Sequence, residues 1–139
     1  MIKKEELKLV TEWDKTFPKS DKVDHSKVTF VNRYGITLAA DMYVPGDKEG
    51  RLPAIAVCGP FGAVKEQCSG LYAQTMAERG FLTIAFDPSF TGESGGNVRY
   101  IVVLQIKLCS ILQIIRSRFL LCYVNGNRLF GVDSALCFI

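Results

Sequence analysis

The chain has only one histidine, His25, and none of its five cysteines belongs to a C-x-x-C pair. Zinc sites are built from grouped Cys and His ligands, so this scarcity argues against a metal site, and we expect no cofactor. The N-terminus also lacks the apolar core of a secretory signal. With an odd number of cysteines, these features predict a reduced, cytoplasmic setting.

The sequence also has little excess charge. Seventeen Lys and Arg residues face fourteen Asp and Glu residues, a net charge of +3. Nucleic-acid binders carry a dominant basic patch, so we predict no nucleic-acid partner. The balance is uneven along the chain: residues 1–100 contain thirteen basic and thirteen acidic residues, whereas residues 101–139 contain four and one.

An uninterrupted apolar run of membrane-spanning length is missing too. The most apolar stretch, after residue 100, is interrupted by Lys107, Arg116 and Arg118. A transmembrane helix needs about 20 apolar residues with few charges, so a membrane span is not predicted. What the chain does have is 139 residues, 48% of them hydrophobic, which suits a single globular core.

Hydrophobic periodicity indicates an α/β fold. Alternating residues around 28–30 and 36–42, separated by an Asn-Arg-Tyr-Gly turn, predict an antiparallel hairpin. Residues 52–58 and 81–86 are continuous apolar runs, typical of strands buried on both faces. Between them, residues 66–79 have helical periodicity, with Tyr72, Ala73, Met76 and Ala77 on one face and Gln74, Thr75 and Glu78 on the other.

We therefore predict that strands 52–58 and 81–86 lie parallel and adjacent or nearly so, joined by a right-handed crossover through the helix. Gly80 is placed to end that helix. The charged lead-in, residues 1–25, is predicted to carry a short helix over residues 5–14.

Residues 26–99 resemble the N-terminal part of an α/β-hydrolase, of the dienelactone-hydrolase-like and Xaa-Pro-peptidase-like branch. The likeness is carried by the hairpin, the Gly-Pro-Phe-Gly-Ala-Val-Lys-Glu-Gln block at 59–67, the helix with Gly80, and the blocks Ala-Phe-Asp at 85–87 and Gly-Glu-Ser-Gly-Gly at 92–96. It implies an incomplete hydrolase fold, in which an antiparallel hairpin leads into parallel strands with a crossover helix.

The resemblance also implies an oxyanion hole in the loop after the first parallel strand. A backbone N–H there stabilises the charge that develops on a carbonyl oxygen during acyl transfer. Pro60 has no N–H, so Phe61 is the candidate donor, with Gly59 and Gly62 shaping the loop. The alternative is an ordinary strand-to-helix turn whose glycines serve geometry alone.

Two further residues are candidates for shaping the site. Ser94 lies in a Gly-Glu-Ser-Gly-Gly match to the nucleophile-elbow pattern, but the predicted strand ends at residue 86, so the strand–turn–helix context is missing and we do not assign Ser94 as nucleophile. Asp87 ends a buried strand, where α/β sheets gather their sites. We expect a structural role for it, organising the following turn through its side chain.

A hydrolase triad needs a histidine, and the only one precedes the first strand. We expect His25 to be a surface residue, and we assign no catalytic role to Cys58 or Cys68, for which no base is available. The resemblance thus implies hydrolysis of a small ester or amide through an acyl-enzyme, with this chain lacking nucleophile and histidine and inactive alone. The alternative is a non-catalytic binding or interaction module. The sequence does not indicate an oligomeric state.

The resemblance stops after Arg99. We divide the chain into the lead-in 1–25, a partial hydrolase domain 26–99 and a divergent apolar tail 100–139. The compositional shift suggests that the tail is translated out of frame; the competing hypothesis is an evolved tail. We expect that this tail does not complete the hydrolase core.

Overall fold

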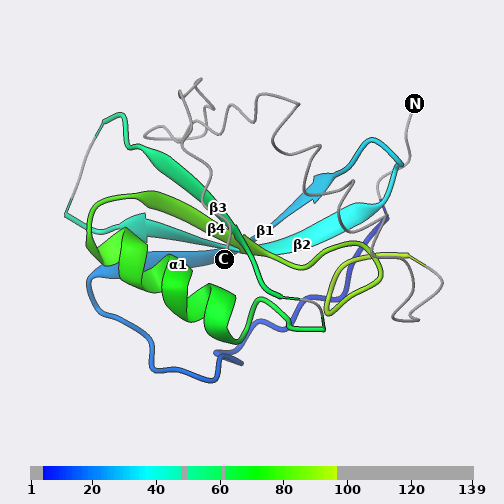
Figure 1. Cartoon of the computed structure of the whole chain (residues 1–139), viewed down its shortest axis with the longest axis horizontal. Coiled ribbons are helices and arrows are strands. Elements are labelled where there is room, and N and C mark those ends of the chain that lie inside the picture. The colour runs from blue at the N-terminus through cyan, green and yellow to red at the C-terminus, as the bar shows by residue number, and fades with distance from the viewer. Residues whose placement is uncertain (1–4, 48–49, 61, 97–139) are drawn as a thin grey trace.

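The computed structural model describes residues 5–47, 50–60 and 62–96. They form one mixed four-stranded sheet with the strand order β1-β2-β4-β3 and one helix, α1 (Figure 1). Both Phe61 and the tail after residue 100 lie outside the described residues, so the predictions made for them stay predictions. Within the described part, no helix is long and apolar enough to cross a membrane.

The predicted hairpin is confirmed and is longer than the periodicity suggested. Strands β1 (Val23–Val31) and β2 (Thr37–Pro45) pair antiparallel without a break in register. At the turn, the Asn32 side-chain oxygen accepts hydrogen bonds from the backbone N–H groups of Tyr34 and Ile36. Gly35 takes a φ of 78°, a conformation that favours glycine.

The strand–helix–strand unit is also confirmed. Strands β3 (Ala54–Cys58) and β4 (Leu82–Phe86) are adjacent and parallel, and α1 (Cys68–Glu78) connects them. Ala73 and Ala77 are fully buried against the sheet. Gly80 follows the helix with a φ of 99° and donates its N–H to the carbonyl of Ala77, as predicted for a helix end.

The lead-in differs from the prediction. Residues 5–14 form no helix but run as an irregular segment that continues along the side of the sheet covered by α1 (Figure 1). Phe17 inserts into the core with 7% of its surface exposed. Gln74, predicted on the outer helix face, is instead buried, because its amide accepts from the N–H of Ser20 and donates to the carbonyl of Pro18. Tertiary contacts therefore decide the conformation of the lead-in.

Hydrophobic residues pack on both faces of the sheet. On the α1 face the cluster comprises Phe17, Val23, Tyr43, Ile55, Val57, Ala73, Ala77 and Ala85. On the opposite face it comprises Leu38, Ala40, Ala56, Cys58, Ile84 and Phe86. Burial on both faces explains why β3 and β4 read as continuous apolar runs.

Candidate functional site

The loops that follow β3 and β4 leave the sheet side by side. Cys58 pairs with Phe86 in the parallel register, so both strands end at the same level. The next residues are Gly59 in one loop and Asp87 in the other. In open α/β sheets, sites form beyond the carboxyl ends of the strands, so this edge is the candidate site.

Asp87 holds these loops together. Its side chain is fully buried; Oδ1 accepts the backbone N–H of Lys65 at 2.8 Å, and Oδ2 accepts Lys65 Nζ at 2.9 Å and the N–H of Glu93 at 3.1 Å. Gly92 is required beside it, since a Cβ there would lie 2.2 Å from Asp87 Oδ2. Lys65 is a partner of Asp87 that the sequence did not indicate.

Lys65 is a buried cation with several anionic partners. Its side chain has no exposed surface, and Nζ contacts the carboxylates of Glu66, Asp87 and Glu93, the last at 2.7 Å. Burial acts to lower the pKa of Lys65, but the charge of Asp87 and the hydrogen bonds that the ammonium group donates to these carboxylates outweigh it and raise the pKa above its ordinary value. Nothing in the local sequence around Lys65 indicates that its side chain is buried.

The ion pairs continue from Glu93 to the lead-in. Glu93 also accepts Lys27 Nζ at 2.7 Å and the N–H of Val10 at 2.7 Å, and Lys27 Nζ lies 3.0 Å from Asp14 Oδ2. Burial acts to raise the pKa of Glu93, but hydrogen bonds from Lys27 and Lys65 lower it overall. The charged network thus joins the loop after β4 to a segment some eighty residues earlier in the sequence.

His25 belongs to a second branch of the network, so the expectation of a surface histidine is wrong. Only 14% of its side chain is exposed, and Nε2 lies 2.9 Å from Asp41 Oδ1, while Lys15 Nζ lies 3.1 Å from Asp41 Oδ2. The imidazole also packs against Trp13 and Tyr43. It is buried because the lead-in, wrongly predicted as a helix, covers this part of the sheet.

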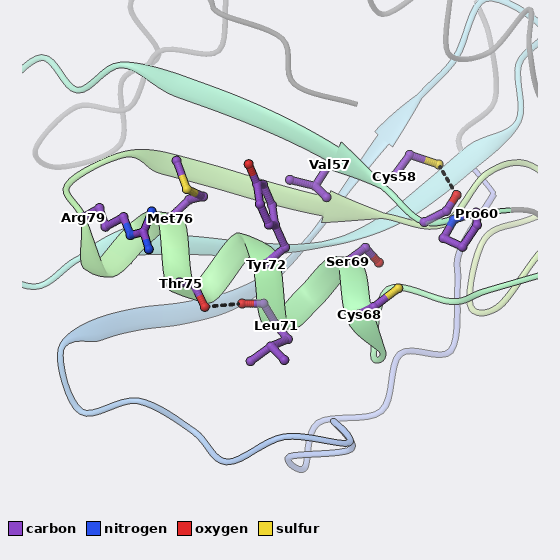
Figure 2. A pocket seen from close by; sticks show the side chains of 11 residues that line it. Val57, Cys58, Pro60, Cys68, Ser69, Leu71, Tyr72, Thr75, Met76 and Arg79 are labelled. Carbon is purple, nitrogen blue, oxygen red and sulfur yellow. Dashed lines mark hydrogen bonds between the residues drawn. The ribbon is translucent and has the colours of Figure 1, made fainter. Parts of the chain in front are cut away.

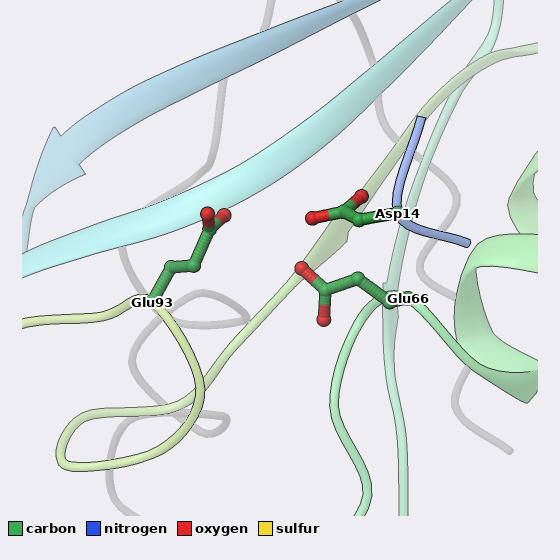
Figure 3. Close-up of side chains that lie close together, drawn as sticks. All are labelled: Asp14, Glu66 and Glu93. Atoms are coloured by element: carbon green, nitrogen blue, oxygen red, sulfur yellow. The ribbon is translucent and has the colours of Figure 1, made fainter. Parts of the chain in front are cut away.

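Three carboxylates of the network come close enough to suggest a cation site. Asp14, Glu66 and Glu93 each place one oxygen within 4.8 Å of the others and converge from three segments (Figure 3). However, Lys27 contacts Asp14 and Glu93, and Lys65 contacts Glu66 and Glu93. These ammonium groups already pair with all three carboxylates and would repel a metal ion, so the donor set does not fit one.

Ser94 is placed to stabilise the loop. It is fully buried, its hydroxyl donates to the carbonyl of Asp87 at 2.7 Å, and it accepts the N–H of Ala39 at 2.9 Å. A nucleophile elbow needs an exposed hydroxyl at a strand–helix turn. This serine has neither feature: its hydroxyl is buried, and it follows a loop after β4.

An apolar groove of about 440 Å³ opens beside the loop after β3 (Figure 2). One wall is the end of β3 with Gly59 and Pro60, and the other is α1 with Leu71, Tyr72 and Met76. Gly62, in the same loop, has a φ of 86°, a conformation that favours glycine.

The two described cysteines differ in exposure. Cys58 is buried, whereas Cys68 is exposed at the start of α1, and both line the groove. His25 is tied to Asp41 on the α1 face of the sheet, where it contacts Trp13 and Tyr43. The described residues therefore do not assemble a cysteine–histidine pair.

The chain is similar in sequence to two bacterial proteins. The chain is 74% identical over 95 residues to the uncharacterized protein PA2218 of Pseudomonas aeruginosa, covering 68% of this chain and 26% of that protein. It is 39% identical over 109 residues to the uncharacterized protein YcjY of Escherichia coli K12, covering 76% of this chain and 36% of that protein. No protein-family model matches.

Solved structures share the architecture. The crystal structure of PA2218 superposes with a TM-score of 0.80 at 57% identity, over 95% of this chain and 40% of that one. The α/β-hydrolase GrgF from a Penicillium species superposes with a TM-score of 0.63 at 23% identity, over 84% of this chain and 37% of that one. The chain thus has an incomplete α/β-hydrolase fold, and it spans between about a quarter and two fifths of the length of these proteins.

Proposed function

We propose that this chain is the oxyanion-loop portion of an α/β-hydrolase that cleaves a small ester or amide through an acyl-enzyme. The observation that carries the proposal is the fixed loop at the carboxyl end of β3, tied to β4 through Asp87, in a fold shared with α/β-hydrolases. Backbone donors held rigidly at such a point stabilise a developing oxyanion.

In the proposed reaction, a nucleophile outside the described residues attacks the carbonyl carbon of the substrate. The carbonyl π-bond electrons move to the oxygen, which the backbone N–H of Phe61 then stabilises. Collapse of this intermediate expels the alcohol or amine and leaves an acyl-enzyme, which water hydrolyses.

A chimera tests the proposal. Residues 5–96 of this chain replace the matching segment of PA2218, and both the chimera and unaltered PA2218 are assayed with p-nitrophenyl esters and anilides of several acyl lengths. We expect turnover by both proteins and none by the present chain alone. A folded PA2218 with no turnover of any of these substrates would contradict the hydrolase assignment and favour a non-catalytic binding module.

The same chimera tests the role of Ser94. Because its hydroxyl is buried between Asp87 and Ala39, we expect Ser94→Ala to leave kcat within about threefold of the parent chimera, since the serine touches no reacting atom. Loss of turnover at unchanged melting temperature would instead identify Ser94 as a nucleophile.

A further inference from the structure

We infer that Lys65 is a positioning residue that fixes the loop between β3 and α1 against Asp87, at the end of β4. The inference rests on the proposed function, in which this loop carries the oxyanion donor. The claim that Lys65 orients the loop is nevertheless measurable without any hydrolysis.

Lys65 forms hydrogen bonds with both side-chain oxygens of the buried Asp87. Its backbone N–H donates to Asp87 Oδ1 at 2.8 Å and its ammonium group donates to Asp87 Oδ2 at 2.9 Å. Two contacts from one residue to one planar group fix orientation as well as distance. Since Asp87 directly follows β4, the loop after β3 is fixed to the end of the neighbouring strand at a point close to the start of α1.

The rest of the loop has weaker attachments of its own. Ala63 donates its N–H to the carbonyl of Pro60, and Gln67 to that of Val64, but both bonds lie within the loop. From outside the loop, the N–H of Thr16 donates to the carbonyl of Glu66, and the hydroxyl of Ser69 donates to the carbonyl of Val64 at 3.4 Å. Lys65 is the loop residue that binds the end of β4 and the loop after it, through Asp87 and Glu93.

Lys27 provides a matched control. It belongs to the same charged network, shares the Glu93 carboxylate with Lys65 and is also largely buried, with 10% of its side chain exposed. Its other partner is Asp14 in the lead-in. Removing either ammonium group takes one positive charge from the network, but only the loss of the Lys65 ammonium group takes a hydrogen bond from Asp87, which then holds the loop through the backbone N–H of residue 65 alone.

The experiment compares Lys65→Met with Lys27→Met by NMR-detected amide hydrogen exchange on the full chain. For Lys65→Met we expect exchange at Ala63 and at residue 65 to accelerate by at least about tenfold more than exchange at the β4 amides, the signature of local opening. For Lys27→Met we expect the same amides to accelerate only as much as β4. Uniform acceleration in Lys65→Met, or the same local effect in both variants, would overturn the inference.

Asp87→Asn is the second variant, for use if Lys65→Met does not fold. It keeps the side-chain shape but replaces one accepting oxygen with an NH₂ group, so it weakens the hydrogen bonds between residue 87 and Lys65. Its lower stability should accelerate exchange throughout the sheet, and we expect exchange at Ala63 and at residue 65 to accelerate further than exchange at the β4 amides. Equal acceleration at both would again overturn the inference.

The chimera then separates this inference from the proposed function. We expect Lys65→Met to lower kcat by at least about tenfold with little change in KM, and Lys27→Met to lower it much less, because orientation of a donor acts in the transition state. Local opening in Lys65→Met together with a parent PA2218 that never turns over substrate would support the loop role and reject the hydrolase. Equal kcat losses in the two variants would reject the positioning role.

Discussion

One face of the sheet is stabilised in two different ways. Where α1 packs, small apolar side chains such as Ala73, Ala77 and Ala85 fill the interface. Beside it, on the same face, Asp41 and Lys65 are buried among ion pairs. Apolar packing loses stability in proportion to the volume removed, whereas a buried ion pair becomes an uncompensated charge when one partner is lost. The charged part should therefore respond more sharply to a single substitution.

The largest effect is expected at Asp87. Asp87→Asn removes the charge that faces Lys65 and places an NH₂ group where an oxygen accepted hydrogen bonds. We expect a loss of about 3–5 kcal/mol in the free energy of unfolding, measured by urea denaturation. Asp24→Asn, at an exposed position, is the control and should stay within about 0.5 kcal/mol. A cost at Asp87 no larger than the control would show that the ion pairs contribute little.

The apolar part is tested by Phe17→Ala. Phe17 anchors the lead-in in the core beside Trp13, whose ring meets it edge-on with centroids 5.7 Å apart. Because some of the gap is near the surface and can be filled by rearrangement, we expect a loss of about 2–3 kcal/mol, at the low end for an aromatic truncation. Val10→Ala in the same segment is exposed and should change stability little. A loss at Phe17 above that of Asp87→Asn would reverse the order proposed for the two parts.

The strands, the helix and their apolar contacts are also the features that the sequence predicts. Local patterns specify them: two apolar runs, one amphipathic helix, Gly80 at its end and the Asn32 turn. Each of these signals acts within a few residues, and each was confirmed. Here the fold class and the order of elements follow from periodicity alone.

The charged part could not be predicted because its contacts span the chain. Lys65 meets Asp87 and Glu93, and Lys27 meets Asp14, at separations that no local pattern encodes. A buried lysine and an exposed one look alike in sequence. The lead-in was assigned a helix for the same reason: its conformation depends on partners such as Glu66 and Gln74, far along the chain.

Acid should weaken the charged part before the apolar part. Burial acts to raise the pKa of Asp14, but hydrogen bonds from Lys15 and Lys27 outweigh it and lower the pKa from 3.8 to about 2. A carboxyl with a lowered pKa contributes stability that is present above its unfolded value and is lost as pH falls through the folded value. We therefore expect the free energy of unfolding to fall between about pH 5 and pH 2.

Asp14→Asn sharpens this test. The variant cannot release or take up that proton, so its stability should depend less steeply on pH over the same range in urea titrations. Asp21→Asn, at an exposed position, should keep the slope of the parent protein. Equal slopes for the parent and Asp14→Asn would show that the ion pairs of Asp14 add no stability.

The smallest effect is expected where the two parts meet, at Tyr43. Its ring packs in the apolar cluster with no exposed surface, and its hydroxyl has no hydrogen-bond partner among residues 5–47, 50–60 and 62–96. Burial and the charges of Asp41, Glu66 and Asp14 raise its pKa well above the ordinary value, so the phenol stays protonated.

A buried hydroxyl without a partner costs its desolvation energy, so Tyr43→Phe should be neutral or stabilising by up to about 1 kcal/mol. Differential scanning calorimetry of Tyr43→Phe beside Tyr34→Phe, at an exposed position, measures it. A loss above about 1 kcal/mol at Tyr43 alone would show that the hydroxyl is hydrogen-bonded and belongs to the charged part after all.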